Sequence, residues 1–199
     1  AEQPRGATLH GPIYLRGGGD PNLTWQKLQL LLRDLRLQGV RHWHGDLVLD
    51  RSYFSPQRPD VGLPPFDESP DAYYNVIPDA LLLNSNLLEL RLQSDADQVV
   101  VQLRTPIQDV HIESQLSLVD GDCKNWDDGW LPPHVQEERG GKLHISLLGS
   151  FVRNCKVDAS TNILDRNVYI ARVWQALWRE LGGTWRGTVR NGSTPTDAK

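Results

Sequence analysis

The sequence predicts an α/β fold whose chain is interrupted by a small, all-β antiparallel domain. Three observations predict it. A strand–helix–strand pattern fills residues 11–49, alternation of apolar and polar residues replaces it between residues 88 and 147, and helical periodicity returns from residue 165. Because the α/β pattern resumes after the alternating segment, we expect one domain to be inserted within another.

The first fifty residues carry the strand–helix–strand unit. Residues 11–19 predict a short strand that runs into a glycine turn, and residues 40–49 predict the next strand. Between them, Thr24 can cap a helix, and Gly39 can end it in a left-handed conformation. Such a unit favours a right-handed crossover between parallel strands, as in a Rossmann-like open sheet. The apolar face of the helix is expected to comprise Leu28, Leu31, Leu32 and Leu35.

The middle of the chain predicts strands of a different kind. Short runs alternate between apolar and polar residues, which is typical of antiparallel sheets with one packed face. These runs lie at residues 88–92, 99–103, 110–119 and 143–147. Residues 120–141 are rich in Gly, Pro, Asp and Trp and predict a polar loop.

A second helix is expected from residue 165, capped by Asp165 or Asn167 and ended by Gly182 and Gly183. A final strand follows at residues 184–189. The apolar stripe of this helix comprises Ile170, Val173, Trp174, Leu177 and Leu181.

These elements define the expected domains. We expect a Rossmann-like α/β domain of residues 9–80 plus 160–192, an inserted β domain of residues 81–159, and a loose polar tail of residues 193–199.

Composition excludes several classes of function. The net charge is −4 and the pI is near 5.8, which argues against a nucleic-acid partner, because phosphate contacts need clustered Lys and Arg. No apolar run is long enough to predict a transmembrane segment. The polar N-terminus, residues 1–6, is not a signal peptide, so we expect a removed leader or a start within a longer protein.

Two patterns invite a cofactor or metal site, and we expect neither. Gly17, Gly18 and Gly19 follow a strand and precede a helix, but Asp20 would place a carboxylate where a nucleotide phosphate should lie. A tight turn is the alternative interpretation. His42 and His44 alternate on one strand without an evident third ligand.

Three stretches carry a family resemblance: IYLRGGGDPNLT at residues 13–24, GDLVLDRSYF at residues 45–54 and ALLLNSN at residues 80–86. In this order and spacing they resemble the DacB-type D-alanyl-D-alanine carboxypeptidase/endopeptidase family, the class C low-molecular-mass penicillin-binding proteins. In that family, two accessory domains interrupt the catalytic domain. The chain is similar to that insertion alone.

The catalytic motifs of such enzymes are missing from the sequence. Acyl transfer needs Ser-x-x-Lys, in which the amine takes the hydroxyl proton, together with Ser-x-Asn and Lys-Thr-Gly. No serine has a lysine three positions on, and no lysine begins Lys-Thr-Gly or Lys-Ser-Gly. Ser160-Thr161-Asn162 matches Ser-x-Asn, a pattern expected by chance in a chain of this length. We therefore expect no catalytic residue in this chain.

The resemblance implies a binding role for residues 64–78. The matching stretch of the family approaches the catalytic cleft and helps to hold the free amino end of a peptidoglycan stem peptide. A carboxylate would attract the ammonium, and an aromatic ring would pack on it. Tyr74 matches the aromatic residue, and either Asp67 or Glu68 matches the acid. A packed loop with solvated acids is the alternative interpretation.

The resemblance also implies a location outside the cytoplasm, in the periplasm, where disulfides persist. Cys123 and Cys155 are therefore expected to form a disulfide, and two buried thiols are the alternative.

The expected partners are a catalytic penicillin-binding domain in the same polypeptide and, through it, the stem peptide. Two other functions stay open: a catalytically inactive periplasmic scaffold or interaction protein with the same fold, and a small nucleotide-binding α/β protein.

Overall fold

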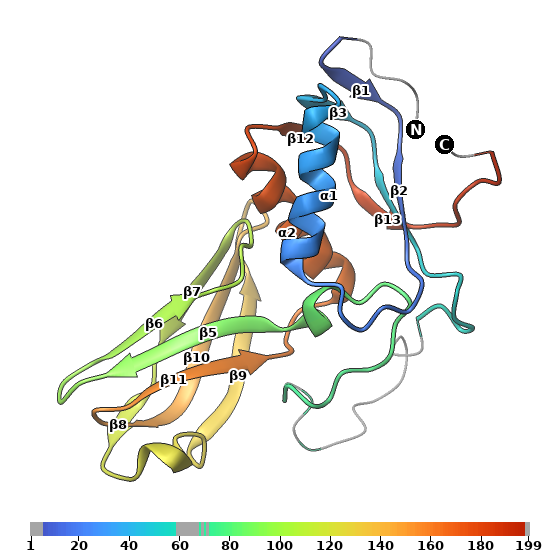
Figure 1. The fold of residues 1–199 in the computed structure, drawn as a ribbon. Coiled ribbons are helices and arrows are strands. Elements are labelled where there is room, and N and C mark those ends of the chain that lie inside the picture. The colour runs from blue at the N-terminus through green and yellow to red at the C-terminus, as the bar shows by residue number, and fades with distance from the viewer. Residues whose placement is uncertain (1–5, 59–67, 69, 71, 198–199) are drawn as a thin grey trace.

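A computed structural model of the chain describes residues 6–58, 68, 70 and 72–197 (Figure 1). It contains an α/β region and a β region. The α/β region comprises β1 (Thr8–His10), β2 (Ile13–Arg16), α1 (Trp25–Leu37), β3 (His42–His44), β4 (Leu47–Asp50), α2 (Arg166–Glu180), β12 (Thr184–Arg186) and β13 (Val189–Asn191). The β region comprises β5 (Leu88–Ser94), β6 (Val99–Leu103), β7 (Val110–Ser114), β8 (Ser117–Val119), β9 (Trp130–Glu137), β10 (Leu143–Val152) and β11 (Lys156–Thr161), with the 3-10 helices η1 (Leu83–Asn86) and η2 (Cys123–Asn125).

The α/β region contains three parallel segments, and each is broken once at a glycine. The breaks fall at Gly11 between β1 and β2, at Gly45 between β3 and β4, and at Gly187 between β12 and β13. The order of the segments is the same on both sides of the breaks, β1–β3–β12 and β2–β4–β13. A side chain on Gly45 would collide with the carbonyl of Gly11, and one on Gly187 with the carbonyl of Gly45. The three breaks therefore form a glycine column across the sheet.

Tryptophans two residues before the glycines reinforce this column. The rings of Trp43 and Trp185 stack at 4.9 Å and 7°. Trp43 Nε1 donates to the carbonyl of Gly11 at 2.9 Å, and Trp185 Nε1 donates to that of Gly45 at 2.8 Å. A Trp-x-Gly pattern thus occurs in the second and third segments, and the single strand expected over residues 40–49 is two strands.

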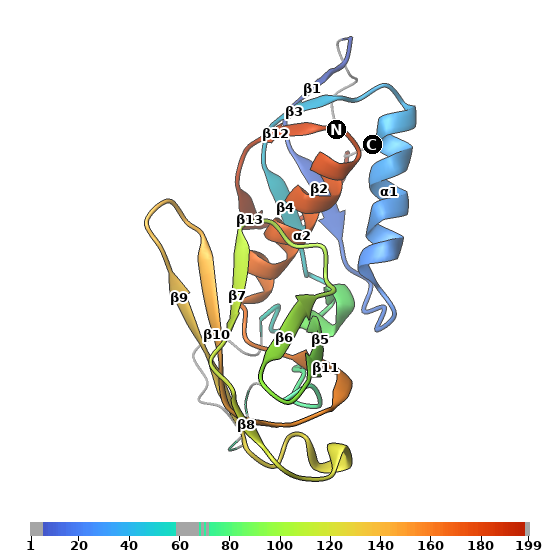
Figure 2. The same ribbon diagram turned by 90° about the vertical axis from the view of Figure 1, so that its left-hand side faces the viewer.

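Both helices lie on the same side of the parallel sheet (Figures 1 and 2). Their starts are as predicted, since the side chain of Thr24 accepts from Lys27 N and that of Asp165 accepts from Val168 N. Gly39 has a φ of 92° where α1 ends. The expected apolar face of α1 needs one correction: Leu31 is exposed, because the packed face is centred on Leu28 and Leu32.

The β region is mixed rather than purely antiparallel. In one sheet, β11, β5 and β6 pair antiparallel as expected. In the other, β10 pairs antiparallel with β9 but parallel with β7 and β8. β7 and β8 run in one direction and β9 runs in the opposite direction. β10 reverses again and lies between β9 on one side and β7 and β8 on the other, so it is parallel to β7 and β8.

Two strands of the β region escaped prediction. β9 lies in the segment expected to be a polar loop, and it contains Pro132 and Pro133. Proline is tolerated there because β9 pairs only with β10 among the described strands, which leaves its other edge unpaired. β11 is also an edge strand, beside β5.

A buried ionic cluster ties together three separate segments of the chain. Arg51 Nε lies 3.0 and 2.9 Å from the carboxylate oxygens of Asp79, and Arg166 Nη1 lies 2.9 Å from Asp79 Oδ2. The three side chains are 1%, 0% and 7% exposed, in that order. Asp79 Oδ1 also accepts from Leu81 N at 2.8 Å. The cluster therefore fixes the end of β4, the segment before β5 and the start of α2 to one another.

Two further links hold the ends of segments. Cys123 and Cys155 form a disulfide with a Cα–Cα distance of 5.3 Å. The segment after β13 is anchored at its start, since Thr194 N donates to Asp50 Oδ2 at 2.7 Å. Within residues 193–199, expected to be a loose tail, Thr194 is thus held by a hydrogen bond.

Candidate functional site

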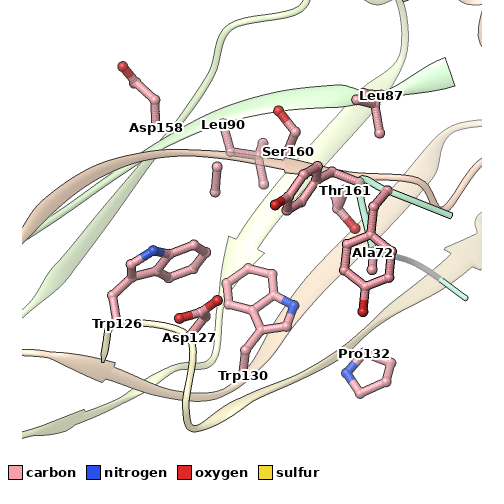
Figure 3. Close-up of a pocket in the computed structure, with 13 residues that line it drawn as sticks. Ala72, Leu87, Leu90, Trp126, Asp127, Trp130, Pro132, Asp158, Ser160 and Thr161 are labelled. Carbon is pink, nitrogen blue, oxygen red and sulfur yellow. The ribbon is translucent and has the colours of Figure 1, made fainter. Parts of the chain in front are cut away.

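A groove of about 620 Å³ lies in the β region between β11 and the segment that leads into β9 (Figure 3). Trp126, Asp127 and Trp130 form one side, and Asp158 and Ser160 lie on the other. The segment before η1 adds two tyrosines to the lining, Tyr73 and Tyr74. Leu87 and Leu90, just before and within β5, also line the groove, which is thus built by four separate stretches of chain.

Aromatic rings give the groove its apolar surface. Trp126 and Trp130 pack edge to face with ring centroids 5.5 Å apart, and Trp126 also contacts Phe151 in the core. Tyr73 and Tyr74 form a second edge-to-face pair at 5.4 Å. The tyrosines are 64% and 61% exposed, so their rings are available to a ligand.

Some polar groups of the groove have a hydrogen-bond partner within the protein, and others do not. Asp158 receives two hydrogen bonds from Arg91, at 2.7 and 2.8 Å, and this interaction lowers the pKa of the Asp158 carboxyl. Among the described residues, the carboxylate of Asp127 and the hydroxyl of Ser160 have no hydrogen-bond partner. Asp127 is therefore the lining carboxylate that can accept hydrogen bonds from a ligand without competition.

Covalent and hydrogen-bonded links hold the walls in place. Cys123 lies three residues before Trp126, and Cys155 lies three residues before Asp158, so the disulfide ties the two sides of the groove together. The tyrosine segment is tied to β11 by a β-bridge between Ala72 and Thr161. Such links reduce the freedom of the groove before a ligand arrives.

The residues predicted to bind substrate are only partly brought together. Tyr74 lines the groove. Glu68 is exposed and is not among the lining residues. Asp67 lies outside the described residues. Sequence reasoning missed Trp126 and Trp130, although two tryptophans flanking two aspartates in a polar segment were a signal that could have pointed to them.

The glycine-rich turn has a structural explanation. Gly17 packs against the backbone of Ala80, where a side chain would collide, and Gly19 N donates to Ala80 O at 2.8 Å. The carboxylate of Asp20 accepts from Asn22 N. The turn therefore holds the segment before η1 against the end of β2, which favours the tight-turn interpretation.

The chance match to Ser-x-Asn is split between two environments. Ser160 lies on β11 at the groove, whereas Asn162 Oδ1 accepts from Asn86 Nδ2 at 2.7 Å and its own amide donates to Asn75 O. The asparagine thus has a structural role between the tyrosine segment and η1.

His42 and His44 are exposed on β3, and no three His, Cys, Asp or Glu side chains of the described residues are grouped as metal ligands would be. None of the described helices has the length and apolar character needed to cross a membrane.

Sequence comparison defines the class of protein. The chain matches the profile of the D-Ala-D-Ala carboxypeptidase 3 (S13) family over residues 1–199, and it belongs to that family. It is 30% identical over 184 residues to D-alanyl-D-alanine carboxypeptidase DacB of Haemophilus influenzae. That alignment covers 91% of this chain but 37% of the relative, so the chain spans little more than a third of its length.

Solved structures show the same fold. Penicillin binding protein 4 (dacB) of Haemophilus influenzae matches with a TM-score of 0.64 at 22% identity, over 97% of this chain and 42% of that one. The same protein in complex with a β-lactam matches with a TM-score of 0.59 at 21% identity, over 97% of this chain and 40% of that one. The combination of mixed sheets and few helices is therefore that of the corresponding part of this protein.

Proposed function

We propose that the chain is the non-catalytic accessory portion of a periplasmic serine D-Ala-D-Ala carboxypeptidase/endopeptidase that acts on peptidoglycan stem peptides. The observation that carries the proposal is family membership combined with the missing catalytic motifs. The relative is a D-alanyl-D-alanine carboxypeptidase, and this chain matches about a third of the relative's length. The nucleophilic serine would lie in a catalytic domain of the same polypeptide, outside these residues.

The proposed arrangement is a Rossmann-like domain of residues 9–80 plus 160–192 with a β domain of residues 81–159 inserted in it. Three parallel segments, with α1 between the first two and α2 before the third, support the first part. The sheets of β5 to β11 support the second. The buried Asp79 cluster would then lie within the first domain, where it fixes the points at which the chain leaves that domain and returns to it.

The stem-peptide end of the cleft is proposed to be lined by Tyr74 and by Asp67 or Glu68. An exposed tyrosine in a groove supports the aromatic half of this site. An ammonium group would gain from the ring face and from the carboxylate. Periplasmic location is supported by the Cys123–Cys155 disulfide, since disulfides persist in oxidising compartments.

Acylation by a fluorescent penicillin tests the proposal. The label should appear on a longer protein, in which this chain is extended at both ends by the flanking coding sequence. It should not appear on this chain alone. The label forms a stable bond only where a serine nucleophile is activated. Label on neither protein would favour the catalytically inactive scaffold instead, and label on this chain would reveal a nucleophile within it.

A further inference from the structure

The two groove tryptophans present their indole N–H groups differently from the other tryptophans. Trp43, Trp178 and Trp185 each donate to a backbone carbonyl, and the N–H groups of Trp25 and Trp174 are buried without a partner among the described residues. Among the described residues, Trp126 and Trp130 have no hydrogen-bond acceptor, and neither N–H is among the buried polar atoms without a partner. Both donors are therefore accessible at the groove.

The groove thus offers hydrogen-bond donors as well as an acceptor beside its rings. The donors include the two indole N–H groups and the hydroxyl of Ser160, and the acceptors include that hydroxyl and the carboxylate of Asp127. Asp158 adds little net charge, because Arg91 is bound to it. A ligand that matches this surface must accept and donate within a short distance.

An ammonium group would match only part of it, the carboxylate of Asp127 and the ring faces. An ammonium carries donors and no acceptor, so the indole N–H groups would face another donor. Each hydroxyl of a sugar ring both donates and accepts, and the carbonyl of an N-acetyl group accepts. The apolar C–H face of a pyranose ring can also cover an aromatic ring, removing apolar area of both from water.

We propose that this groove binds N-acetylated hexosamine rings of a peptidoglycan glycan strand. Trp126 and Trp130 would contact the sugar faces and acetamido carbonyls, and Asp127 would accept from sugar hydroxyls. This inference rests on the proposed function, since it assigns the glycan part of the same polymer. Because glycan and stem peptide are covalently joined, Tyr74 and the tryptophans would contact neighbouring parts of one substrate. A volume of about 620 Å³ is in the range of small-ligand sites.

Nuclear magnetic resonance of the seven indole N–H groups in this chain tests the inference. The probe is a soluble tetramer of β-1,4-linked N-acetylglucosamine. We expect saturable shifts of the Trp126 and Trp130 signals, assigned through Trp126→Phe and Trp130→Phe, and unchanged signals from the other five. Asp127→Asn should weaken binding about tenfold. Asp128→Asn, which changes a neighbouring carboxylate that does not line the groove, is the matched control.

The outcomes separate this inference from the proposed function. Absence of saturable shifts, or tetramer affinity unchanged by Trp130→Ala in a folded variant, would overturn the glycan assignment. Shifts caused by a stem peptide with a free amino end, and not by the tetramer, would also overturn it while leaving the proposed function intact. Tetramer binding by an extended protein that penicillin does not label would support the glycan site and refute the enzymatic parent.

Discussion

One pair of tryptophans in the α/β region and one pair in the β region use the same side chain in opposite ways. In the α/β region, Trp43 and Trp185 stack on each other and donate to glycine carbonyls of neighbouring segments. In the β region, Trp126 and Trp130 also pack against each other, but their N–H groups have no acceptor among the described residues. A tryptophan whose N–H donates to the backbone therefore stabilises the fold. A tryptophan whose N–H is accessible and has no acceptor belongs to a surface that can bind a ligand.

Ion pairs also differ between the two regions, in how far they are buried. The carboxylate of Asp79 is buried beneath two arginines, whereas the ion pair of Asp158 and Arg91 lies at the surface of the β region. A buried pair becomes costly when one partner is lost, while an exposed pair is screened by water.

The largest effect is expected from breaking the buried cluster. Asp79→Asn removes the charge that compensates Arg51 and Arg166, so the free energy of unfolding should fall by about 3–5 kcal/mol. Urea denaturation measures the change. Asp158→Asn is the matched variant on the exposed pair, and it should cost less than about 1 kcal/mol. Equal losses in both variants would break the comparison between the regions.

Loss of the disulfide should have the next largest effect. The bond closes a loop between residues separated by 32 positions, so reduction should lower the free energy of unfolding by about 3–4 kcal/mol. Reduction should also weaken binding of the N-acetylglucosamine tetramer at the groove, because the disulfide joins the two sides of the groove. Urea denaturation with and without reductant measures the first effect, and Cys123→Ser combined with Cys155→Ser is the control. An unchanged midpoint would contradict the prediction.

Matched tryptophan variants sharpen the comparison directly. Trp185→Phe leaves the carbonyl of Gly45 without its indole donor and loses volume beside Trp43, so it should destabilise the fold by about 1–3 kcal/mol. Trp130→Phe removes an N–H with no acceptor among the described residues and should change stability by less than about 0.5 kcal/mol. Thermal unfolding of both variants gives the answer, and a larger loss in Trp130→Phe would reverse the assignment of roles.

The smallest effect concerns acid pH and the anchored segment after β13. Burial raises the pKa of Asp50, but hydrogen bonds from Ser52 and Thr194 outweigh it and hold this pKa below its usual range. A depressed folded-state pKa stabilises the protein above the unfolded value of about 3.9, and this contribution is lost as the pH falls below it. Thermal unfolding between pH 7 and pH 2 should therefore show a shallower decline for Asp50→Asn. An identical slope in both proteins would contradict the role of Asp50.

Local signals in the sequence predicted the helices well. Capping by Thr24 and Asp165 and termination at Gly39 depend on residues within one turn, so the pattern alone carries them. The edge strands β9 and β11 were missed because Pro132 and Pro133 interrupt one pattern and polar residues dominate the other. Direction within the β10 sheet depends on the path of the chain, which periodicity does not encode.

The site was less predictable for a physical reason. Tyr74 came from a family resemblance, and it does line the groove. The opposite side comes from Trp126 and Trp130, about fifty residues away in the chain, and only the tertiary structure brings them near Ser160. Whether a tryptophan N–H is bonded or free also depends on long-range neighbours, so composition could not separate the two classes.

The glycine column has a consequence for how the sheet assembles. Gly11, Gly45 and Gly187 stand side by side, and a shift of one segment by a single residue would press a side chain against a neighbouring carbonyl. The third segment arrives more than a hundred residues after the second. The glycine column therefore fixes the register in which β12 and β13 can pair with β3 and β4. This register does not depend on the length or shape of the β region that precedes them in the chain.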